Sequence, residues 1–486
     1  MFTKKVLFVS SEVFPLIKTG GLADVSGSLP SALQNLGVDI RILIPGYPTV
    51  LNQLSDLQSI GMLNNLPVIE HAELMLGTIK DTQVKVMAIK SASLYERDGG
   101  PYSDVHGEEW PDNALRFGVL SKVAAILSGA QTPLQDWQPD IVHCNDWQTG
   151  LTPAYMKLQE NTEAKAIISL HNMAFQGCFP SEWVATLGLP ASSFIMEGFE
   201  YHGQLSFLKA GIYYADAIST VSPSYAKEIQ TAEFGFGLEG LLKTRGSEIK
   251  GILNGIETDE WNPEIDTHLI KTFSASKIAG KKQVKSALQK KLGLNNDANA
   301  PLLGVVSRLT HQKGLDLLLP NMQYLLDAGC QLALLGSGEN VLESAFLTIA
   351  DQNPGRVSVT IGYNEPLSHQ VMAGCDMFIM PSRFEPCGLN QLYGLAYGTP
   401  PIVNATGGLA DSVIDTNRIT IKDKTANGFV MAEVSAEALL ACILRALEVF
   451  NDETKIWRQI QKNGMSQNLS WDKSALEYLA LYQSLS

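Results

Sequence analysis

Short runs of apolar, often β-branched residues alternate with longer amphipathic stretches along almost the whole chain. Near-continuous apolar strands separated by helices are typical of parallel sheets that helices cover on both faces, so the sequence predicts an α/β fold. The predicted strands are 6–10, 38–44, 84–90, 140–144, 166–170, 217–221, 250–253, 302–307, 331–335, 356–361, 376–380 and 400–404. The stretches expected to be helical include 111–129, 204–214, 313–327, 366–374 and 388–397.

This alternation breaks between residues 258 and 300, in a segment that opens with Thr258–Pro263. A chain of 486 residues is long enough for about two to four domains of roughly 100–200 residues each. We therefore expect a domain boundary near residues 255–265. No long Gly/Ser linker separates the two halves.

Charge and hydropathy limit the partners that the chain can have. Its 36 Lys and Arg residues and 50 Asp and Glu residues give a net charge of −14, so nucleic acid is not expected as the main partner. No run approaches the roughly 18 apolar residues of a membrane span, and no membrane partner is expected. The first apolar run, Val6–Val9, is too short for an export signal. The six scattered cysteines form no local metal or redox motif, and we expect a cytoplasmic location.

One hexapeptide occurs twice. Thr19–Asp24 reads Thr-Gly-Gly-Leu-Ala-Asp, and Thr406–Asp411 repeats it. Each copy follows a predicted strand and precedes a helical stretch. The repeat is either a packing device in two similar domains or a pair of amide nests at helix starts, where backbone N–H groups hold anions.

Cationic side chains and one carboxylate follow strands in the second half. Arg308 and Lys313 follow strand 302–307, and Glu385 follows strand 376–380 between Pro381 and a helix start. Ligands of open α/β sheets lie beyond the carboxyl ends of strands, so the two cations could neutralise a diphosphate. Glu385 is either a helix-capping carboxylate or a group that contacts the hydroxyls or the reacting centre of a substrate.

Polar side chains also follow two strands of the first half. Asp146 and Trp147 come after strand 140–144, and His171 comes after strand 166–170. Asp146 and His171 could bind sugar hydroxyls and Trp147 could offer a stacking face, although buried His and Asp residues are often only hydrogen-bonding partners in the core. No two aspartates are two positions apart, so the Asp-x-Asp metal clamp of many nucleotide-sugar transferases is absent.

Together these stretches resemble the bacterial-type glycogen (starch) synthase family over nearly the whole chain. The matching pieces are Lys18–Val25, His143–Trp147, His171–Gly177, Gln204–Asp216, Leu253–Pro263, Ser307–Asp316, Ile361–Tyr363, Pro381–Tyr393, Thr406–Val413 and Ser470-Trp471. The resemblance implies a GT-B fold with two Rossmann-like domains facing a deep interdomain cleft. It implies an N-terminal domain at 1–258 on the acceptor side, a C-terminal domain at 259–465 on the donor side, and a helix at 466–486 that returns to the first domain.

The resemblance also implies a reaction. Glucose would move from ADP-glucose to the non-reducing 4-OH end of an α-1,4-glucan, such as glycogen or a maltooligosaccharide, with retention at the anomeric carbon. Lys18, Arg308 and Lys313 would hold the diphosphate. The backbone amides of Gly20 and Gly21 would approach it.

The remaining roles are carried over in the same way. Tyr363 would stack near the base, and Asn254 would line the donor site. Glu385 would be the carboxylate at the glucose, which Asp146 and His171 would contact from the other domain. The other residues expected on the nucleotide side are Gly388, Leu389, Thr406, Gly407 and Gly408.

No cofactor and no metal are expected, because the Asp-x-Asp clamp is absent and Arg308, Lys313 and helix dipoles would have to stabilise the leaving group instead. Front-face return, in which the acceptor attacks from the leaving-group side, and a covalent intermediate at Glu385 both remain open. Three other functions also remain open at this point: a GT-B enzyme with another donor, a pyridoxal-phosphate glucan phosphorylase, and a non-enzymatic glucan-binding scaffold.

Overall fold

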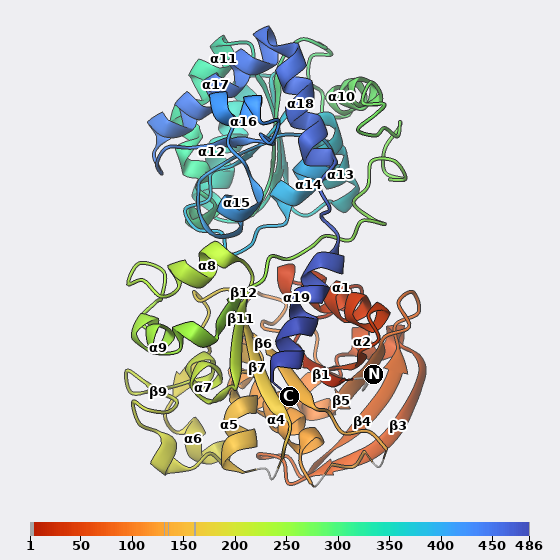
Figure 1. The fold of residues 1–486 in the computed structure, drawn as a ribbon, viewed down its shortest axis with the longest axis vertical. Helices are drawn as coiled ribbons and strands as arrows, with labels where there is room; N and C mark the ends of the chain where they lie inside the picture. The colour runs from red at the N-terminus through yellow and green to blue at the C-terminus, as the bar shows by residue number, and fades with distance from the viewer. Residues whose placement is uncertain (1–3, 131, 135, 160–161, 486) are drawn as a thin grey trace. The chain divides into compact units, whose positions relative to one another are not determined.

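The computed structural model describes residues 4–130, 132–134, 136–159 and 162–485, and the chain divides into two compact units (Figure 1). Unit 1 consists of Met1–Asn254 together with Trp471–Ser486, and unit 2 consists of Gly255–Ser470. The chain therefore passes from one unit to the other twice. No helix in the described part of the chain is both long and apolar enough to cross a membrane.

Unit 1 is built on a nine-stranded sheet in the order β12-β11-β7-β6-β1-β2-β5-β4-β3. Its strands are β1 (Lys5–Val9), β2 (Asp39–Pro45), β3 (Ser55–Asn64), β4 (His71–Thr78), β5 (Lys85–Lys90), β6 (Ile141–Asn145), β7 (Lys165–Leu170), β11 (Ala217–Thr220) and β12 (Ile249–Gly251). From β12 to β5 the strands pair in parallel, as predicted. The strand order reverses between β1 and β6, and such a switch point is where open α/β sheets bind ligands.

The expectation of parallel strands does not hold at one edge of unit 1. There β3 and β4 form an antiparallel hairpin, and β4 pairs antiparallel with β5. Most residues of β3 are exposed or only partly buried, so this strand lacks the continuous apolar run by which buried strands are recognised. A separate small sheet of β8 (Cys178–Pro180), β10 (Gln204–Ser206) and β9 (Glu200–Tyr201) was not predicted either.

The C-terminal helix α19 (Trp471–Ser484) packs against α1 (Gly21–Asn35) of unit 1, although the two helices lie at opposite ends of the sequence (Figure 1). The other helices of unit 1 are α2 (Pro48–Gln53), α3 (Ala92–Tyr95), α4 (Asn113–Ser128), η1 (Trp147–Thr149), α5 (Leu151–Leu158), α6 (Trp183–Thr186), η2 (Ala191–Ser193), α7 (Phe207–Tyr214), α8 (Pro223–Glu228), α9 (Glu239–Thr244) and η3 (Gly246–Glu248).

Unit 2 is built on a six-stranded parallel sheet in the order β15-β14-β13-β16-β17-β18. Its strands are β13 (Leu302–Val306), β14 (Gln331–Gly336), β15 (Val357–Ile361), β16 (Met377–Met380), β17 (Pro401–Val403) and β18 (Phe429–Val430). Numbered from β13, this is the order 3-2-1-4-5-6 of a dinucleotide-binding sheet, with its switch point between β13 and β16.

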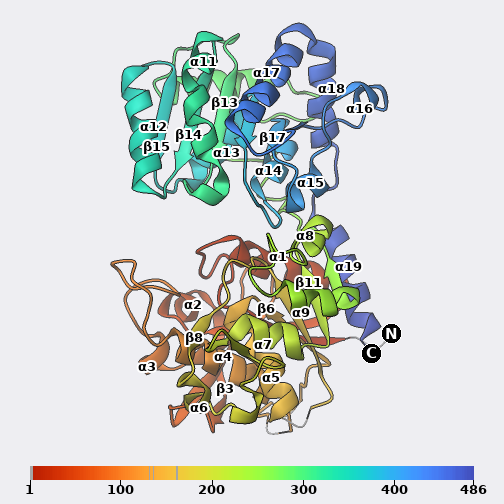
Figure 2. The same cartoon turned by 90° about the vertical axis from the view of Figure 1, so that its left-hand side faces the viewer.

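Helices cover both faces of this sheet (Figure 2). Successive residues of β16 show this, because Met377 and Ile379 belong to one buried cluster while Phe378 and Met380 belong to another. The helices are α10 (Gly280–Lys291), η4 (His311–Lys313), η5 (Leu315–Leu317), η6 (Leu319–Asn321), α11 (Met322–Asp327), α12 (Asn340–Gln352), α13 (Glu365–Gly374), α14 (Asn390–Ala396), α15 (Gly407–Ser412), α16 (Arg418–Lys422), α17 (Ala436–Asp452) and α18 (Thr454–Met465).

The single helix expected over 313–327 is therefore wrong. Three short 3-10 turns precede α11, because Gly314 takes a left-handed φ of 69° and Pro320 lacks the N–H of a helix interior. This irregular path places Lys313 beside the loop that follows β16.

Candidate active site

The loops after β13 and β16 touch at the switch point of unit 2. A Cβ atom on Gly314 would lie 2.2 Å from the carbonyl oxygen of Pro381, so only glycine allows this approach. The Arg383 N–H donates to the carbonyl of Gln312 at 2.9 Å, which joins the same two loops. The contact brings together side chains that are 72 positions apart in sequence.

Glu385 is buried at this contact, and its carboxylate is held on two sides. Lys313 Nζ donates to Oε2 of Glu385 at 2.5 Å, and Ser382 Oγ donates to the same oxygen at 3.0 Å. Glu385 therefore faces a cation and a hydroxyl and does not cap a helix by a side-chain hydrogen bond, because α14 has none of that kind at its first turn.

The second copy of the repeated hexapeptide supports the backbone around Glu385. The Gly408 N–H donates to the carbonyls of Glu385 and Pro386 at 3.1 and 3.0 Å. A Cβ on Gly407 or Gly408 would come within 2.1 or 2.0 Å of the carbonyl oxygens of Glu385 or Cys387. These contacts favour the packing interpretation for the second copy, because its glycines are required by the close approach of two chain segments.

A second ion pair braces the same loops. Arg383 binds both carboxylate oxygens of Asp316 at 2.7 Å, and its Nη1 also donates to the carbonyl of His311. The hydrogen bonds from Arg383 lower the pKa of the Asp316 carboxyl below its ordinary value. Sequence reasoning missed this pair, because a partly buried Arg and Asp 67 positions apart give no signal of their mutual contact.

Arg308 follows Ser307 in the loop after β13 and is exposed. Its guanidinium has no hydrogen-bonding or ionic partner among the residues that the structure describes. Of the two predicted phosphate-binding cations of unit 2, Lys313 is therefore engaged with Glu385, and Arg308 is available to an external anion.

The other nucleotide-side predictions for unit 2 fall on nearby loops. Tyr363 follows β15, is 76% exposed and donates its hydroxyl to Oε2 of Glu365 at 2.6 Å. Gly388 has a left-handed φ of 69° and precedes Leu389, the residue before α14. Thr406 is buried and precedes α15.

In unit 1 the first copy of the hexapeptide is an occupied amide nest. The N–H groups of Thr19 and Gly20 donate to Oε2 of Glu12, and Tyr102 donates its hydroxyl to Oε1. Burial raises the pKa of the Glu12 carboxyl above its ordinary value, although these hydrogen bonds oppose the shift. The nest thus holds a carboxylate of the chain itself, and Glu12 and Tyr102 are site residues that the sequence did not reveal.

The outer side of this loop is open. A Cβ atom on Gly20 or Gly21 would meet no atom within 4 Å, in contrast to the second copy. Lys18 is exposed beside them and pairs with Asp24 at 2.7 Å. The same six residues therefore serve close packing in unit 2 and present exposed backbone in unit 1.

Asp146 and His171 meet at the ends of β6 and β7. The His171 N–H donates to Oδ1 of Asp146 at 2.7 Å, and His171 Nε2 lies 3.0 Å from Oδ1 of Asn145. Asn145 uses its Nδ2 to donate to the carbonyl of Val9, so its Oδ1 accepts from Nε2 of His171 and leaves Nδ1 as an acceptor.

Burial shifts both groups toward their neutral forms. It raises the pKa of Asp146 to about 7, with the charge of Glu12 adding to the effect, and lowers the pKa of His171 to about 4. Asp146 also has a φ of 56° and a ψ of −172°, a conformation that non-glycine residues rarely adopt. A strained backbone and a shifted pKa at the same residue are typical of functional sites.

Trp147 does not offer the open stacking face that was expected. Its ring packs among Phe117, Phe179 and Phe207 at centroid distances of 5.0, 5.8 and 6.2 Å. Asn254, the last residue of the first stretch of unit 1, is buried, and its Oδ1 has no hydrogen-bond partner in the described part of the chain.

Comparison with known proteins places this geometry in a family. The family model for the starch synthase catalytic domain matches residues 5–244, and the model for glycosyl transferases group 1 matches residues 285–463. The glycogen synthase of Nitrosospira multiformis is 51% identical over 99% of this chain and 97% of its own length. The chain belongs to the glycogen synthase family. The glycogen synthase of Dechloromonas aromatica is also similar, at 48% identity over 99% of both chains.

Solved structures agree with this assignment. The catalytic domain of starch synthase IV from Arabidopsis thaliana, bound to ADP and acarbose, has a TM-score of 0.89 and 31% identity over 99% of both chains. Sucrose-phosphate synthase from Thermosynechococcus elongatus, at a TM-score of 0.59 and 18% identity, shares the fold. The expected GT-B fold is confirmed, and this glycogen synthase family member is a glycosyltransferase that uses a nucleotide-sugar donor and a glucan acceptor.

Proposed function

We propose that the chain transfers glucose from ADP-glucose to the non-reducing 4-OH end of an α-1,4-glucan, with retention of the anomeric configuration. The observation that carries this proposal is the part-buried Lys313–Glu385 pair at the switch point of unit 2, with the exposed Arg308 guanidinium on the same loop as Lys313. The Arabidopsis starch synthase structure holds ADP and acarbose, which supports an adenine nucleotide and a glucan-like ligand for its relatives.

Charge governs the donor side of the reaction. Breaking the bond between C1 of glucose and the β-phosphate oxygen leaves negative charge on the diphosphate and positive charge on the sugar. Arg308 and Lys313 stabilise the diphosphate, and the carboxylate of Glu385 stabilises the sugar. Lys313 lies between these two roles, because it already pairs with Glu385 and gains a second anion when the donor binds.

Unit 1 supplies the other groups of the proposed site. Lys18 and the exposed backbone of Gly20 and Gly21 contact the diphosphate, since no side chain blocks a ligand there. His171, neutral at pH 7, accepts a hydrogen bond from a glucose hydroxyl at Nδ1, and Asp146 accepts another. Asn254 offers its unpaired Oδ1 to the donor. From unit 2, Tyr363 stacks near the adenine.

The acceptor completes the transfer. Its 4-OH oxygen forms a bond to C1, and its proton leaves with a phosphate oxygen in front-face return. A covalent intermediate at Glu385 would give the same stereochemistry by two displacements. Water must be kept from C1 in either route, because hydrolysis of the donor would otherwise compete.

The decisive experiment measures transfer with a glycogen primer and either ADP-glucose or UDP-glucose as donor. Faster turnover of ADP-glucose supports the proposal, whereas a preference for UDP-glucose or release of free glucose overturns it. The same assay in excess EDTA should retain activity, because cations of the chain replace a metal clamp. A glucan phosphorylase would instead show the visible absorbance of pyridoxal phosphate, and a glucan-binding scaffold would turn over neither donor.

We also propose the cytoplasm as the place of this reaction. All six cysteines are free thiols, and most of them are buried, which fits a reducing compartment.

A further inference from the structure

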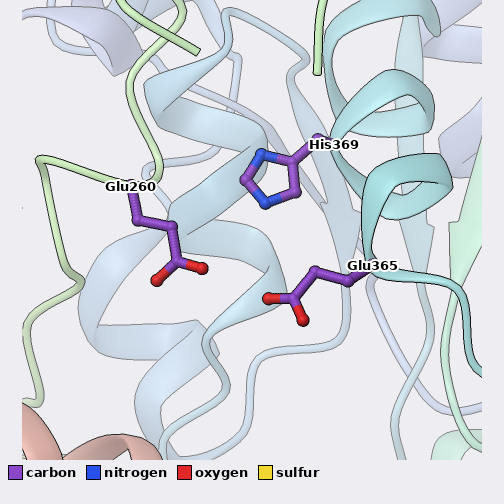
Figure 3. Close-up of side chains that lie close together, drawn as sticks. All are labelled: Glu260, Glu365 and His369. Atoms are coloured by element: carbon purple, nitrogen blue, oxygen red, sulfur yellow. The ribbon is translucent and has the colours of Figure 1, made fainter. Parts of the chain in front are cut away.

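Two carboxylates and an imidazole converge in unit 2, outside the residues proposed for glucosyl transfer (Figure 3). The ligand atoms of Glu260, Glu365 and His369 all lie within 4.8 Å of one another. Glu365 and His369 are four positions apart on α13 and therefore lie on one face of that helix. Glu260 reaches them from the segment between β12 and α10, and in Figure 3 the two carboxylates face one another below the imidazole ring.

The ring of His369 is fixed in its orientation. Its Nδ1 lies 2.8 Å from Oδ2 of Asp266, and the ring stacks on Trp261 at a centroid distance of 3.8 Å and an interplanar angle of 13°. Because the carboxylate of Asp266 accepts a hydrogen bond from the N–H at Nδ1, the other ring nitrogen, Nε2, carries the lone pair. A histidine that donates from one nitrogen to a carboxylate is the usual partner arrangement of a metal-binding imidazole.

Nε2 of His369 lacks a partner, although the residue is completely buried. Within the described part of the chain, no hydrogen-bond donor or acceptor contacts this atom. A buried polar atom without a partner is unfavourable unless something binds it, and such atoms are rare in native proteins. The atom belongs to the cluster with the two glutamates, so a group bound there would also meet both carboxylates.

We propose that Glu260, Glu365 and His369 bind one first-row divalent cation, such as Zn²⁺. The two carboxylates carry two negative charges, and a divalent cation neutralises them while it satisfies Nε2. One nitrogen and two oxygen ligands suit Zn²⁺, with water as the fourth ligand. Ligand atoms around a tetrahedral Zn²⁺ lie about 3.4 Å apart, so the widest pair has to close by no more than about 1.4 Å through rotation of the glutamate side chains.

The surroundings suit a cation. A surface hollow of about 340 Å³ leads to His369 and is lined by the acidic residues Glu257, Asp259 and Asp266 in addition to Glu260. The hydroxyl of Tyr363 donates to Oε2 of Glu365 and so orients this carboxylate, as outer hydrogen bonds orient metal ligands. The bound cation would fasten the segment before α10 to the first turn of α13.

Binding to the whole, untagged protein tests the proposal without any use of the transfer activity. The protein is stripped with EDTA, desalted and titrated with ZnCl₂ by calorimetry, and the bound metal is counted by elemental analysis. We expect one Zn²⁺ per chain, a higher melting temperature with Zn²⁺, and visible d–d absorption when Co²⁺ replaces it. Binding of less than one equivalent overturns the proposal.

Substitutions locate the site. Glu260→Gln and Glu365→Gln keep the side-chain shape, and each should weaken Zn²⁺ binding at least about a hundredfold; Asp266→Asn should weaken it by roughly 10–100-fold. Glu448→Gln, an exposed glutamate on α17, is the matched control and should bind as the unaltered protein does. Circular dichroism confirms folding of each variant. If Zn²⁺ binds Glu260→Gln and Glu365→Gln as tightly as the control, the assignment is wrong, whatever donor the enzyme uses.

Discussion

At the scale of single residues, the environment of Glu385 explains why a carboxylate is tolerated in a buried position. Lys313 supplies the opposite charge, Ser382 supplies a hydrogen bond, and the backbone of Gly408 holds the segment. Burial of a charge is tolerated when such partners are present and costly when one is removed. The carboxylate of Glu385 is therefore held in a fixed position, and its negative charge suits the positive charge that develops on the sugar.

Glu385→Gln should lower kcat at least about a hundredfold while the protein stays folded, because the variant keeps the shape and removes the charge that stabilises the transition state. Initial rates with ADP-glucose and glycogen measure the effect. Glu437→Gln, which alters an exposed glutamate on α17, serves as the control. A folded Glu385→Gln enzyme with kcat near that of the control would remove Glu385 from the proposed mechanism.

Asp146 gives the stability of the protein a predictable pH dependence. Its pKa is about 7 in the folded chain and near 3.8 when unfolded, so the folded state binds more protons between these values. Stability therefore falls as the pH rises from about 4 to about 7. Asp146→Asn keeps the hydrogen bond from the His171 N–H and removes the titration. Its melting temperature should match that of the unaltered protein near pH 4 and exceed it above pH 7.

Melting curves between pH 4 and 8 check this expectation, with Asp98→Asn as a control at an exposed aspartate. A constant difference in melting temperature across the range would mean that Asp146 does not titrate there.

At the scale of elements, the two copies of the hexapeptide show why an identical sequence can serve two purposes. Both copies begin a helix, α1 and α15, as the sequence predicted. What differs is the neighbour: Gly407 and Gly408 press against the Glu385 segment, whereas Gly20 and Gly21 have open space beside them. The local sequence determines the helix start, and the tertiary contacts determine the use of the glycines.

Two matched substitutions test this difference. Gly21→Ala places a methyl group in open space at the start of α1, so stability should be unchanged or slightly higher, but the KM for ADP-glucose should rise by roughly tenfold, or about 1.4 kcal/mol. Gly408→Ala forces a Cβ to within 2.0 Å of the Cys387 carbonyl and should cost about 1–3 kcal/mol or more. Urea denaturation and donor kinetics measure both. Equal losses of stability would contradict the distinction.

Buried strands were predictable because a strand covered on both faces is a nearly continuous apolar run, as β1 and β14 show. The hairpin of β3 and β4 was missed because one of its strands is largely exposed.

The candidate site was predictable only in part. Residue types after strand ends made Glu385, Arg308 and Asp146 candidates, since a position after a strand end is a local property of the sequence. The Lys313–Glu385 ion pair and the carboxylate of Glu12 in the glycine loop were not predictable, because they depend on loop contacts that no spacing rule describes.

At the scale of the whole molecule, a buried chain of hydrogen bonds joins the last helix to the sheet of unit 1. Tyr482 on α19 lies 2.7 Å from Nδ1 of His143 on β6, whose Nε2 lies 2.6 Å from Ser169 on β7; Ser169 in turn contacts Ser219 on β11. Burial lowers the pKa of His143 to about 3, so the imidazole is neutral and works as a hydrogen-bonding link. The N-terminal unit thus depends on the far end of the chain.

Removal of residues 471–486 should therefore destabilise unit 1 selectively. The helix buries Trp471, Tyr478 and Tyr482, and aromatic side chains of this kind bury roughly 150–250 Å² each, which corresponds to several kcal/mol of stabilisation. Unit 2 draws its three buried clusters from its own residues, so a fragment of residues 255–470 should unfold cooperatively by itself.

Scanning calorimetry of the full chain, the truncated chain and the fragment should show one transition shared by all three and a second that moves to lower temperature on truncation. Tyr482→Phe should move that second transition by less, since it leaves only His143 Nδ1 unpaired, at a cost of about 1–3 kcal/mol. If truncation lowers both transitions equally, or neither, α19 is not part of the folding unit of the N-terminal sheet.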